Sequence, residues 1–459
     1  MFKKIEIWIL YVVILLSILF SFGFGVLVRQ EIVGDTKLGK IDISFLSKPA
    51  AYLAGLPAKT LKQLLKPNSN RVNDPWDENR YFYNQYGFDG TNNSFESYIL
   101  LCRYDGYINE GVVELIDLTN FEVLHTWNPD IDAFNDMVDQ VDEFKYLNRD
   151  HNNSRAIPGS PYLMKDGNLL FGQIRIINEC SKLVFQNTHD FFHHSIELDK
   201  EGNIWAPSYI YPQSLPVEKV GRDVVFDNGY FDDGIVKLNS NGRLLFEKSV
   251  SQIFIDNGLE YLLFAHGEDY EEDPIHLNDI QPVNFDGDFW KKGDVFLSLR
   301  NQSMIILFRP STNQIIWKGT GPFLRQHDVN ILDENRISIF NNRSINVFKD
   351  VNIIDSNNEV IVYNFKKDKY ISYLKDSLAE NDVRTITGGR SKILPNGDLL
   401  VEETNSSKIL YFNADGSLRW TYLNRAENGN VYAVGWSRIL YNQKDILTVK
   451  EFLKSRVKC

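Results

Sequence analysis

The chain has 459 residues, of which 43% are hydrophobic and 13% aromatic. This composition supplies a large apolar core and excludes intrinsic disorder for most of the sequence. The formal net charge is −12 and the acidic residues are scattered along the chain. Nucleic acid is therefore excluded as a partner, because its binding needs a basic face.

An apolar segment near the N-terminus predicts a membrane anchor. Between Ile5 and Val28 the only charged residue is Glu6. At about 1.5 Å per helical residue, this stretch is long enough to cross a hydrocarbon core of about 30 Å. Lys3 and Lys4 precede it, so the positive-inside rule predicts a cytoplasmic N-terminus. An uncleaved anchor is favoured over a cleaved signal peptide, because the segment exceeds a usual signal core and no A-x-A-like site follows.

Three segments are expected along the chain. Residues 1–30 form the cytoplasmic tip and the transmembrane anchor, residues 31–80 form a partly helical connector, and residues 81–459 form the main domain. The protein is then a single-pass protein of the inner or plasma membrane. Its C-terminal domain is expected in the periplasm or at the cell exterior.

The three cysteines are too few for a disulfide scaffold. Cys102, Cys180 and Cys459 also lack a CxxC spacing, which excludes a zinc site built on cysteine. In an oxidising compartment Cys102 and Cys180 are candidates to pair, and two buried free thiols are an equal alternative. Both alternatives stay open.

Two kinds of hairpin alternate after about Tyr81, each with a tight polar turn between apolar runs. Hairpins of the first kind span residues 162–172, 196–208, 329–342 and 391–404. Hairpins of the second kind span residues 112–127, 235–247, 304–317 and 409–420. Two successive hairpins make a four-stranded blade, so the repeat predicts an all-β propeller of five or six blades. The insertions at 131–147 and 365–380 are expected to form short helices.

Two histidines occupy the same place in their repeats. His194 precedes the turn residue Gly202 by eight positions, and His327 precedes Asn335 by eight positions. The first strand of each propeller blade lines the central channel, so equivalent positions converge on its axis. The equivalent residues in two other repeats are Gly159 and Gly389, which are expected to leave room for a ligand.

His276 and Arg300 extend this prediction. His276 opens a third strand of the same kind, and Arg300 closes the strand that follows. A cluster of His194, His276, His327 and Arg300 is the expected result. The remaining histidines, His125, His151, His189 and His266, are interpreted as structural or surface residues, and strand alternation is expected to point His193 away from His194.

The residue types favour an anion over a metal ion. An arginine in the same pocket opposes a cation, and no carboxylate shares the repeated position. Arginine instead presents a planar fork of donors to sulfate or phosphate oxygens, and a neutral histidine offers one nitrogen as nucleophile or base. No metal and no cofactor are expected. The pattern alone does not choose between His194 and His327 as nucleophile.

The sequence resembles the bacterial arylsulfotransferase family from about residue 97 to residue 440. The stretches that carry the resemblance are DPIHLNDIQPV, GDVFLSLRNQSMIILFRPSTNQIIWKGTGPFLRQHD and GRSKILPNGDLLVEETNS. The resemblance implies a six-bladed propeller that moves a sulfuryl group from an aryl sulfate ester to a phenol through a sulfohistidine. It implies His327 as the nucleophile, His276, Asn278 and Arg300 as ligands of the sulfate oxygens, and His194 as the remaining pocket histidine.

Two other functions compete with this one. The first is a non-catalytic cell-surface propeller that binds a sugar, a sulfated ligand or a protein partner. The second, quinone-dependent oxidation, is weaker because the sequence has no calcium or cofactor motif. The partners expected for the transferase are a small aromatic sulfate ester, a phenolic acceptor and the membrane.

Overall fold

A computed structural model describes residues 6–33, 37–38, 41–64, 85–138, 147, 152–188, 191–215, 230–263, 273–347, 350–353, 357–457 and 459. The chain divides into two compact units, Met1–Ser69 and Asn70–Cys459. Each unit is described by itself.

The first unit is mainly helical. Helix α1 (Ile7–Val33) contains a segment, Ile7–Gln30, that is long and apolar enough to cross a membrane. Most of the side chains between Ile7 and Gln30 are exposed. A short hairpin of β1 (Lys37–Leu38) and β2 (Ile41–Asp42) follows, and then the amphipathic helix α2 (Ser44–Leu64).

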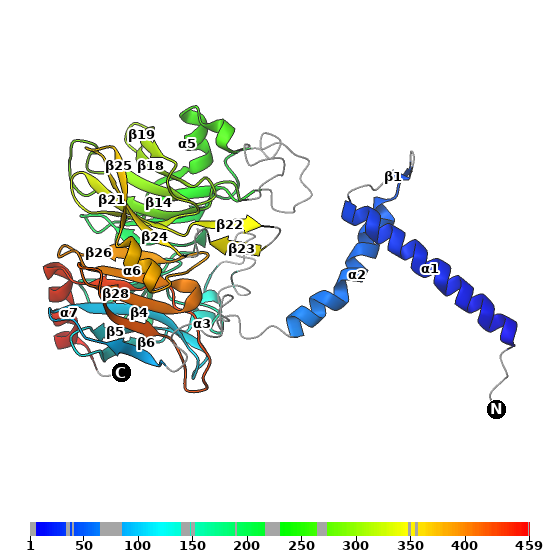
Figure 1. Cartoon of the computed structure of the whole chain (residues 1–459), viewed down its shortest axis with the longest axis horizontal. Helices are drawn as coiled ribbons and strands as arrows, with labels where there is room; N and C mark the ends of the chain where they lie inside the picture. The colour runs from blue at the N-terminus through cyan, green and yellow to red at the C-terminus, as the bar shows by residue number, and fades with distance from the viewer. Residues whose placement is uncertain are drawn as a thin grey trace. The chain divides into compact units, whose positions relative to one another are not determined.

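The second unit is a propeller of six antiparallel sheets, as predicted (Figure 1). Blade 1 contains β30 (Arg438–Leu440), β4 (Tyr98–Asp105), β5 (Glu110–Asp117) and β6 (Glu122–Trp127). Blade 2 contains β7 (Tyr162–Leu163), β8 (Leu169–Phe171), β9 (Arg175–Ile177) and β10 (Leu183–Gln186). Blade 3 contains β11 (Phe191–Phe192), β12 (Glu197–Leu198), β13 (Ile204–Tyr209), β14 (Asp233–Leu238) and β15 (Leu244–Ser249).

The other three blades have the same pattern. Blade 4 contains β16 (Leu277–Pro282), β17 (Val295–Leu299), β18 (Met304–Arg309) and β19 (Gln314–Gly319). Blade 5 contains β20 (His327–Ile331), β21 (Arg336–Asn341), β24 (Glu359–Asn364) and β25 (Lys369–Tyr373). Blade 6 contains β26 (Arg390–Ile393), β27 (Leu399–Glu403), β28 (Lys408–Phe412), β29 (Leu418–Leu423) and β3 (Gly87–Gly90).

The ring is closed by strands from both ends of the propeller sequence. Strand β3, from the N-terminal side, pairs with β29 on the outer edge of blade 6. Strand β30, from the C-terminal side, pairs with β4 as the inner strand of blade 1. These exchanges cover two strand edges that an open ring exposes to aggregation.

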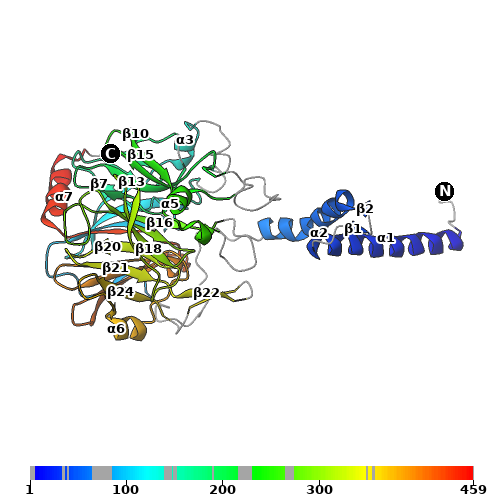
Figure 2. The ribbon, with the colours of Figure 1, turned by 90° about the horizontal axis from the view of Figure 1, so that it is seen from above.

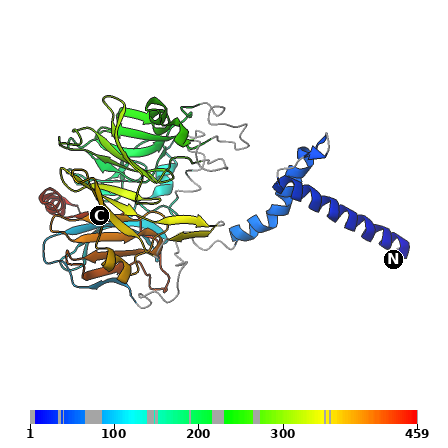
Figure 3. The same ribbon diagram turned by 45° about the horizontal axis from the view of Figure 1, so that its top comes forward.

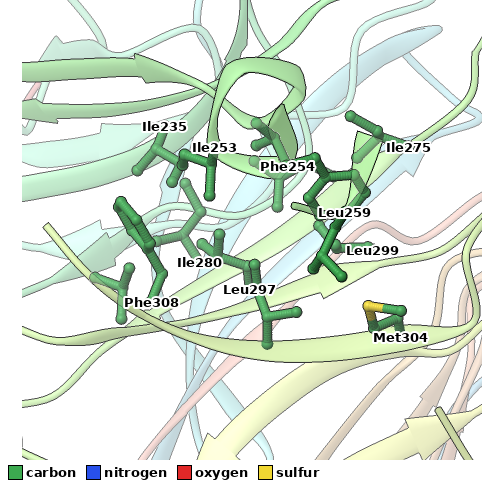
Figure 4. Packing of buried hydrophobic residues seen from close by; sticks show 14 of the residues in the cluster. Ile235, Ile253, Phe254, Leu259, Ile275, Ile280, Leu297, Leu299, Met304 and Phe308 are labelled. Atoms are coloured by element: carbon green, nitrogen blue, oxygen red, sulfur yellow. The ribbon is translucent and has the colours of Figure 1, made fainter. Parts of the chain in front are cut away.

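Apolar side chains between successive blades form the core. Strand β18 shows why: Ile306 and Phe308 pack toward blade 3, whereas Ile305 and Leu307 pack toward blade 5. Alternation along a strand sends neighbouring side chains to opposite faces, so a continuous apolar run is buried on both. Figure 4 shows the cluster between blades 3 and 4. Burial of each side chain of this size stabilises the fold by about 1.5–3 kcal/mol relative to leaving it exposed.

The insertions agree only in part with the expected helices. In the first, helix α3 covers Ile131–Asn135, and most of the remainder lies outside the described residues. In the second, β25 occupies Lys369–Tyr373 and helix α6 begins at Lys375 and ends at Glu380. A third insertion forms helix α5 (Val250–Asp256) and a 3-10 turn at Glu260–Leu263.

A hairpin and a C-terminal helix complete the propeller. Strands β22 (Ser344–Val347) and β23 (Asp350–Ile353) form a separate hairpin between β21 and β24, drawn in yellow in Figure 3. Helix α7 (Gln443–Ser455) lies at the outer edge of the propeller (Figures 1 and 2). Its Val449 and Phe452 pack into the cluster between blades 1 and 2.

The disulfide differs from the pair that the sequence made a candidate. Cys180 bonds to Cys459, and Cys102 is a buried free thiol. Cys102 lies inside β4, whereas Cys180 lies in the turn between β9 and β10. The sequence offered no reason to choose Cys459, because the partners are 279 residues apart and meet only when α7 docks on the closed ring.

Candidate active site

Three histidines meet where the inner strands begin. His194 lies between β11 and β12, His276 immediately precedes β16, and His327 is the first residue of β20. The ring centroid of His194 is 4.9 Å from that of His276 and 6.4 Å from that of His327. Inner strands of different blades enter the channel at one end, which is why residues far apart in sequence converge there.

The backbone at two of these positions is unusual. His194 has a φ of 56° and His276 a φ of 55°, both in the left-handed region. Non-glycine residues rarely adopt this region, and they are concentrated at functional sites. The turn at each strand entrance directs the imidazole away from the regular alternation of the strand.

His327 is held in one tautomer by Asn342. The Asn342 amide nitrogen donates to the carbonyl oxygens of Thr385 and Gly388, at 3.2 and 2.9 Å. Its Oδ1 is therefore the atom that lies 2.7 Å from His327 Nδ1, and that nitrogen must carry the proton. The backbone N–H of Gly388 donates to His327 Nε2 at 3.2 Å, which agrees with a lone pair on Nε2.

His327 is also kept uncharged. Its side chain is buried, with 1% of the residue exposed. Burial is the largest cause that lowers the pKa of His327 to about 3; the Asn342 hydrogen bond opposes it, and Arg300 and His276 add to it. At neutral pH the ring is a neutral imidazole whose Nε2 carries a lone pair, the form required of a nucleophile. Nε2 must release the hydrogen bond from the Gly388 N–H before it attacks.

The other members of the cluster are positioned by their neighbours. His276 Nδ1 bonds to Asp273 Oδ2, which leaves its Nε2 free of that bond. The backbone N–H of Arg300 donates to the carbonyl of His276 at 3.1 Å, so strand pairing places these residues side by side. Burial, and then nearby charges that include Arg300, lowers the pKa of His194 well below its usual value.

Asn278 connects two blades. Its amide nitrogen donates to the backbone carbonyl of Gln326 at 2.8 Å, and the side chain is fully buried. Asn278 lies at an irregularity in the pairing of β16 with β17, and a similar irregularity follows His327 in β20. Such bulges redirect side chains. In this conformation Asn278 fixes the residue before His327.

His193 does not point away from His194, contrary to the prediction from alternation. The Nδ1 atoms of the two rings are 2.7 Å apart, and His193 Nε2 lies 3.3 Å from Asp233 Oδ1. Alternation failed because both histidines lie between strands, where the left-handed turn at His194 rotates its ring. Asp233, in β14, is fully buried, and burial raises the pKa of its carboxyl.

The structure adds an aromatic residue to the site and corrects one of the two glycine predictions. Trp436 adjoins the cluster, with its ring 5.9 Å from His194 and 6.3 Å from His327. Gly159 lines a cavity beside His194, as expected. Gly389 leaves no such room, because a Cβ there would lie 2.4 Å from Phe340 Cε1.

Of the histidines assigned to structural roles, His125 bonds to the Glu179 carbonyl, and the other three lie outside the described residues.

A buried ionic network lies next to the histidines. Arg390 contacts Asp328 and Glu197 at 2.9 and 3.2 Å, and Arg438 contacts Glu197 at 3.0 Å. Burial alone would raise the pKa of Glu197, but Arg438 and Arg390 hold it at about 2. A larger cavity of about 770 Å³ lies at the other end of the inner strands, where Gly202 turns. It does not include the histidine cluster.

The sequence matches a known protein family. A sequence profile described as arylsulfotransferase (ASST) matches residues 157–425, more than half of the chain. The chain belongs to the arylsulfotransferase family. His194, His276, Arg300 and His327 all lie inside the range matched by the arylsulfotransferase profile, whereas Trp436 lies beyond it. Family membership supports assignment to the sulfotransferase class.

Solved structures give only distant likenesses. A protein of unknown function from Bacteroides caccae is 10% identical over 75% of this chain and 99% of its own, with a TM-score of 0.43. TolB from Acinetobacter baumannii is 8% identical over 87% of this chain and 74% of its own, with a TM-score of 0.41. No curated protein matches the sequence. Both TM-scores are below 0.5, so neither structure bears on the chemistry of this chain.

Proposed function

We propose that the protein transfers a sulfuryl group from an aryl sulfate ester to a phenol through a sulfohistidine on His327. The observation that carries the proposal is the neutral, buried imidazole of His327, whose ring centroid lies 6.4 Å from that of His194. The His194 ring centroid in turn lies 4.9 Å from that of His276. In the first half-reaction, Nε2 forms a bond to sulfur, the bond from sulfur to the aryl oxygen breaks, and the phenolate leaves with the electron pair.

The second half-reaction reverses these roles. The acceptor oxygen attacks sulfur, and the nitrogen–sulfur bond breaks and returns its electron pair to Nε2. The phenolic proton passes to a neighbouring base, for which His194 is positioned. Arg300, His276 and Asn278 are proposed to stabilise the three sulfuryl oxygens, where fixed positive charge and donors lower the barrier.

The proposed cellular location agrees with this chemistry. We place the N-terminus in the cytoplasm and the propeller in the periplasm or outside the cell. The Cys180–Cys459 disulfide supports an oxidising compartment. An aryl sulfate donor needs no cytoplasmic nucleotide. Protease added to spheroplasts should degrade the propeller, and protection of the propeller would contradict this orientation.

The activity is tested with the full chain in detergent. With 4-nitrophenyl sulfate and phenol, the wild type should release nitrophenol, and an alkaline quench should trap one sulfuryl group on the peptide that contains His327. His327→Ala should lose both signals, while His125→Gln, outside the cluster, should keep them. Absence of both signals in the wild type favours the binding-protein alternative. Full activity of His327→Ala contradicts the nucleophile.

A further inference from the structure

Arg175 is a buried cation without a carboxylate partner among the described residues. Only 3% of the residue is exposed. Its guanidinium donates to Asn135 Oδ1, a neutral oxygen, and lies 5.8 Å from the ring of Phe134. Burial alone lowers the pKa of Arg175, to about 10, and no nearby charge opposes this effect. The group is nevertheless a full cation at neutral pH.

Two other buried arginines of the propeller form ion pairs with carboxylates. Arg390 and Arg438 both contact the carboxylate of Glu197, and Arg390 also contacts Asp328. Burial of an unpaired charge costs several kcal/mol in real proteins, and pairing offsets much of that cost. Arg175 lacks this compensation in the described structure. A buried group that lowers the stability of the fold without a compensating contact is typical of a functional site.

The backbone holds Arg175 at the wall of a cavity. Arg175 begins β9, after a tight turn in which Gln173 and Ile174 both have left-handed φ values of 61° and 51°. The Gln173 side chain both donates to the carbonyl of Phe192 and accepts from its N–H. The turn is therefore tied to the segment that leads directly into His193 and His194.

The cavity connects Arg175 with the histidine cluster. It has a volume of about 190 Å³, and Arg175 and His194 both line it. Its apolar walls include Ile157, Phe171 and Phe192. An apolar cavity of about 150 Å³ is known to hold benzene, so this one has room for an aromatic ring. His194 and Arg175 would both border such a ring.

We propose that this cavity is an aryl subsite in which Arg175 binds an anionic substituent of the substrate, so that the preferred acceptors are phenols with a carboxylate group. The proposal rests on the sulfotransferase function proposed above and adds the class of acceptor. The carboxylate would supply the counter-charge that the protein lacks, through a paired, bidentate contact that arginine favours. The phenolic oxygen would then face the sulfuryl group.

Binding is measured first, because it does not depend on turnover. Calorimetric titration of the full chain in detergent compares 4-hydroxybenzoate with its uncharged methyl ester. We expect the acid to bind roughly 10- to 100-fold more tightly, the range of a charge-assisted hydrogen bond in a buried site. Equal binding of the two compounds, or tighter binding of the ester, overturns the proposal without any need for a variant.

A matched pair of variants assigns the preference to Arg175. Arg175→Met keeps most of the side-chain volume and removes the charge, so the ratio of acid to ester affinity should fall to about one. Arg243→Gln removes an exposed arginine that does not line the cavity and should keep the wild-type ratio. The melting temperature of Arg175→Met should equal or exceed that of the wild type. Retention of the acid preference in Arg175→Met overturns the proposal.

Turnover separates this proposal from the general function. With 4-nitrophenyl sulfate as donor, kcat/KM should be higher for 4-hydroxybenzoate than for its methyl ester. Transfer without such a preference contradicts the subsite and leaves the sulfotransferase function intact. Selective binding of the acid without transfer supports the subsite and contradicts the sulfotransferase function for this donor.

Discussion

The Nδ1 atoms of His193 and His194 lie 2.7 Å apart, so one of the two rings must donate a proton to the other. Asp233 favours a proton on Nε2 of His193, because its carboxylate oxygen lies 3.3 Å from that nitrogen. His193 Nδ1 is then the acceptor and His194 Nδ1 the donor. This arrangement leaves the Nε2 lone pair of His194 available as a base.

Asp233→Asn should weaken that base. We expect kcat/KM for transfer to phenol to fall roughly 10- to 100-fold, because an acceptor with a pKa of about 10 needs proton removal. For a nitrophenol acceptor that is already ionised, kcat/KM should fall much less. The two acceptors are compared with 4-methylumbelliferyl sulfate as donor. Asp256→Asn, on the outer helix α5, is the control, and equal losses for both acceptors would indicate only structural damage.

Asn342→Asp should change the acid limit of the reaction. In the wild type the pKa of His327 is about 3, so its protonation should not limit the rate at pH 5. A carboxylate at position 342 would stabilise the imidazolium and raise that pKa, which moves the acid limb of the pH–rate profile upward. Asn342→Ala should lower kcat by about 10- to 100-fold through loss of orientation. If the acid limb also moved to higher pH in Asn342→Ala, the negative charge introduced by Asn342→Asp would not be the cause of the shift.

Stability should fall as the solution becomes acidic below about pH 6.5. An unfolded histidine has a pKa of about 6.5, whereas His327 and His194 both have lowered values in the folded state. Their contribution is complete above the unfolded pKa and is lost as the unfolded chain takes up protons first. Each histidine contributes a slope of up to about 1.4 kcal/mol per pH unit.

The slope is measured from urea unfolding at several pH values between 5 and 7. The double variant His194→Gln with His327→Gln should have a smaller slope, even if its stability at pH 7 differs from that of the wild type. A slope identical to the wild-type slope would show that other groups cause the acid sensitivity.

Thiol alkylation checks the disulfide. Under denaturing, non-reducing conditions only Cys102 should react, and reduction should expose Cys180 and Cys459. Reduction should lower the stability by about 2–5 kcal/mol, because the bond closes a long loop. The double variant Cys180→Ser with Cys459→Ser should melt like the reduced wild type and should not respond to reductant. Alkylation of all three cysteines without reductant would contradict the pairing.

The regular part of the propeller was predictable from local patterns. Each predicted hairpin corresponds to adjacent strands, for example 304–317 with β18 and β19, because turn residues and alternation act over a few positions. Closure by β3 was not predictable in this way, since its partner β29 lies more than 300 residues away. The placement of His193 was wrong because alternation applies within strands and fails at a left-handed turn.

The sequence by itself determined the apolar N-terminal segment, the blade repeat and the candidates His194, His276, Arg300 and His327. Hydropathy, turn chemistry and family motifs are local properties, and each can be recognised in the sequence without knowledge of the fold. Only the tertiary structure decided that Asn342 orients His327, that Cys180 pairs with Cys459, and that Arg175 stands in a cavity beside His194. The Asn342 contact lies within blade 5, where Asn342 directly follows the strand that pairs with β20. The other two relationships arise between blades or between the ends of the ring, where packing brings together residues that no short-range pattern connects.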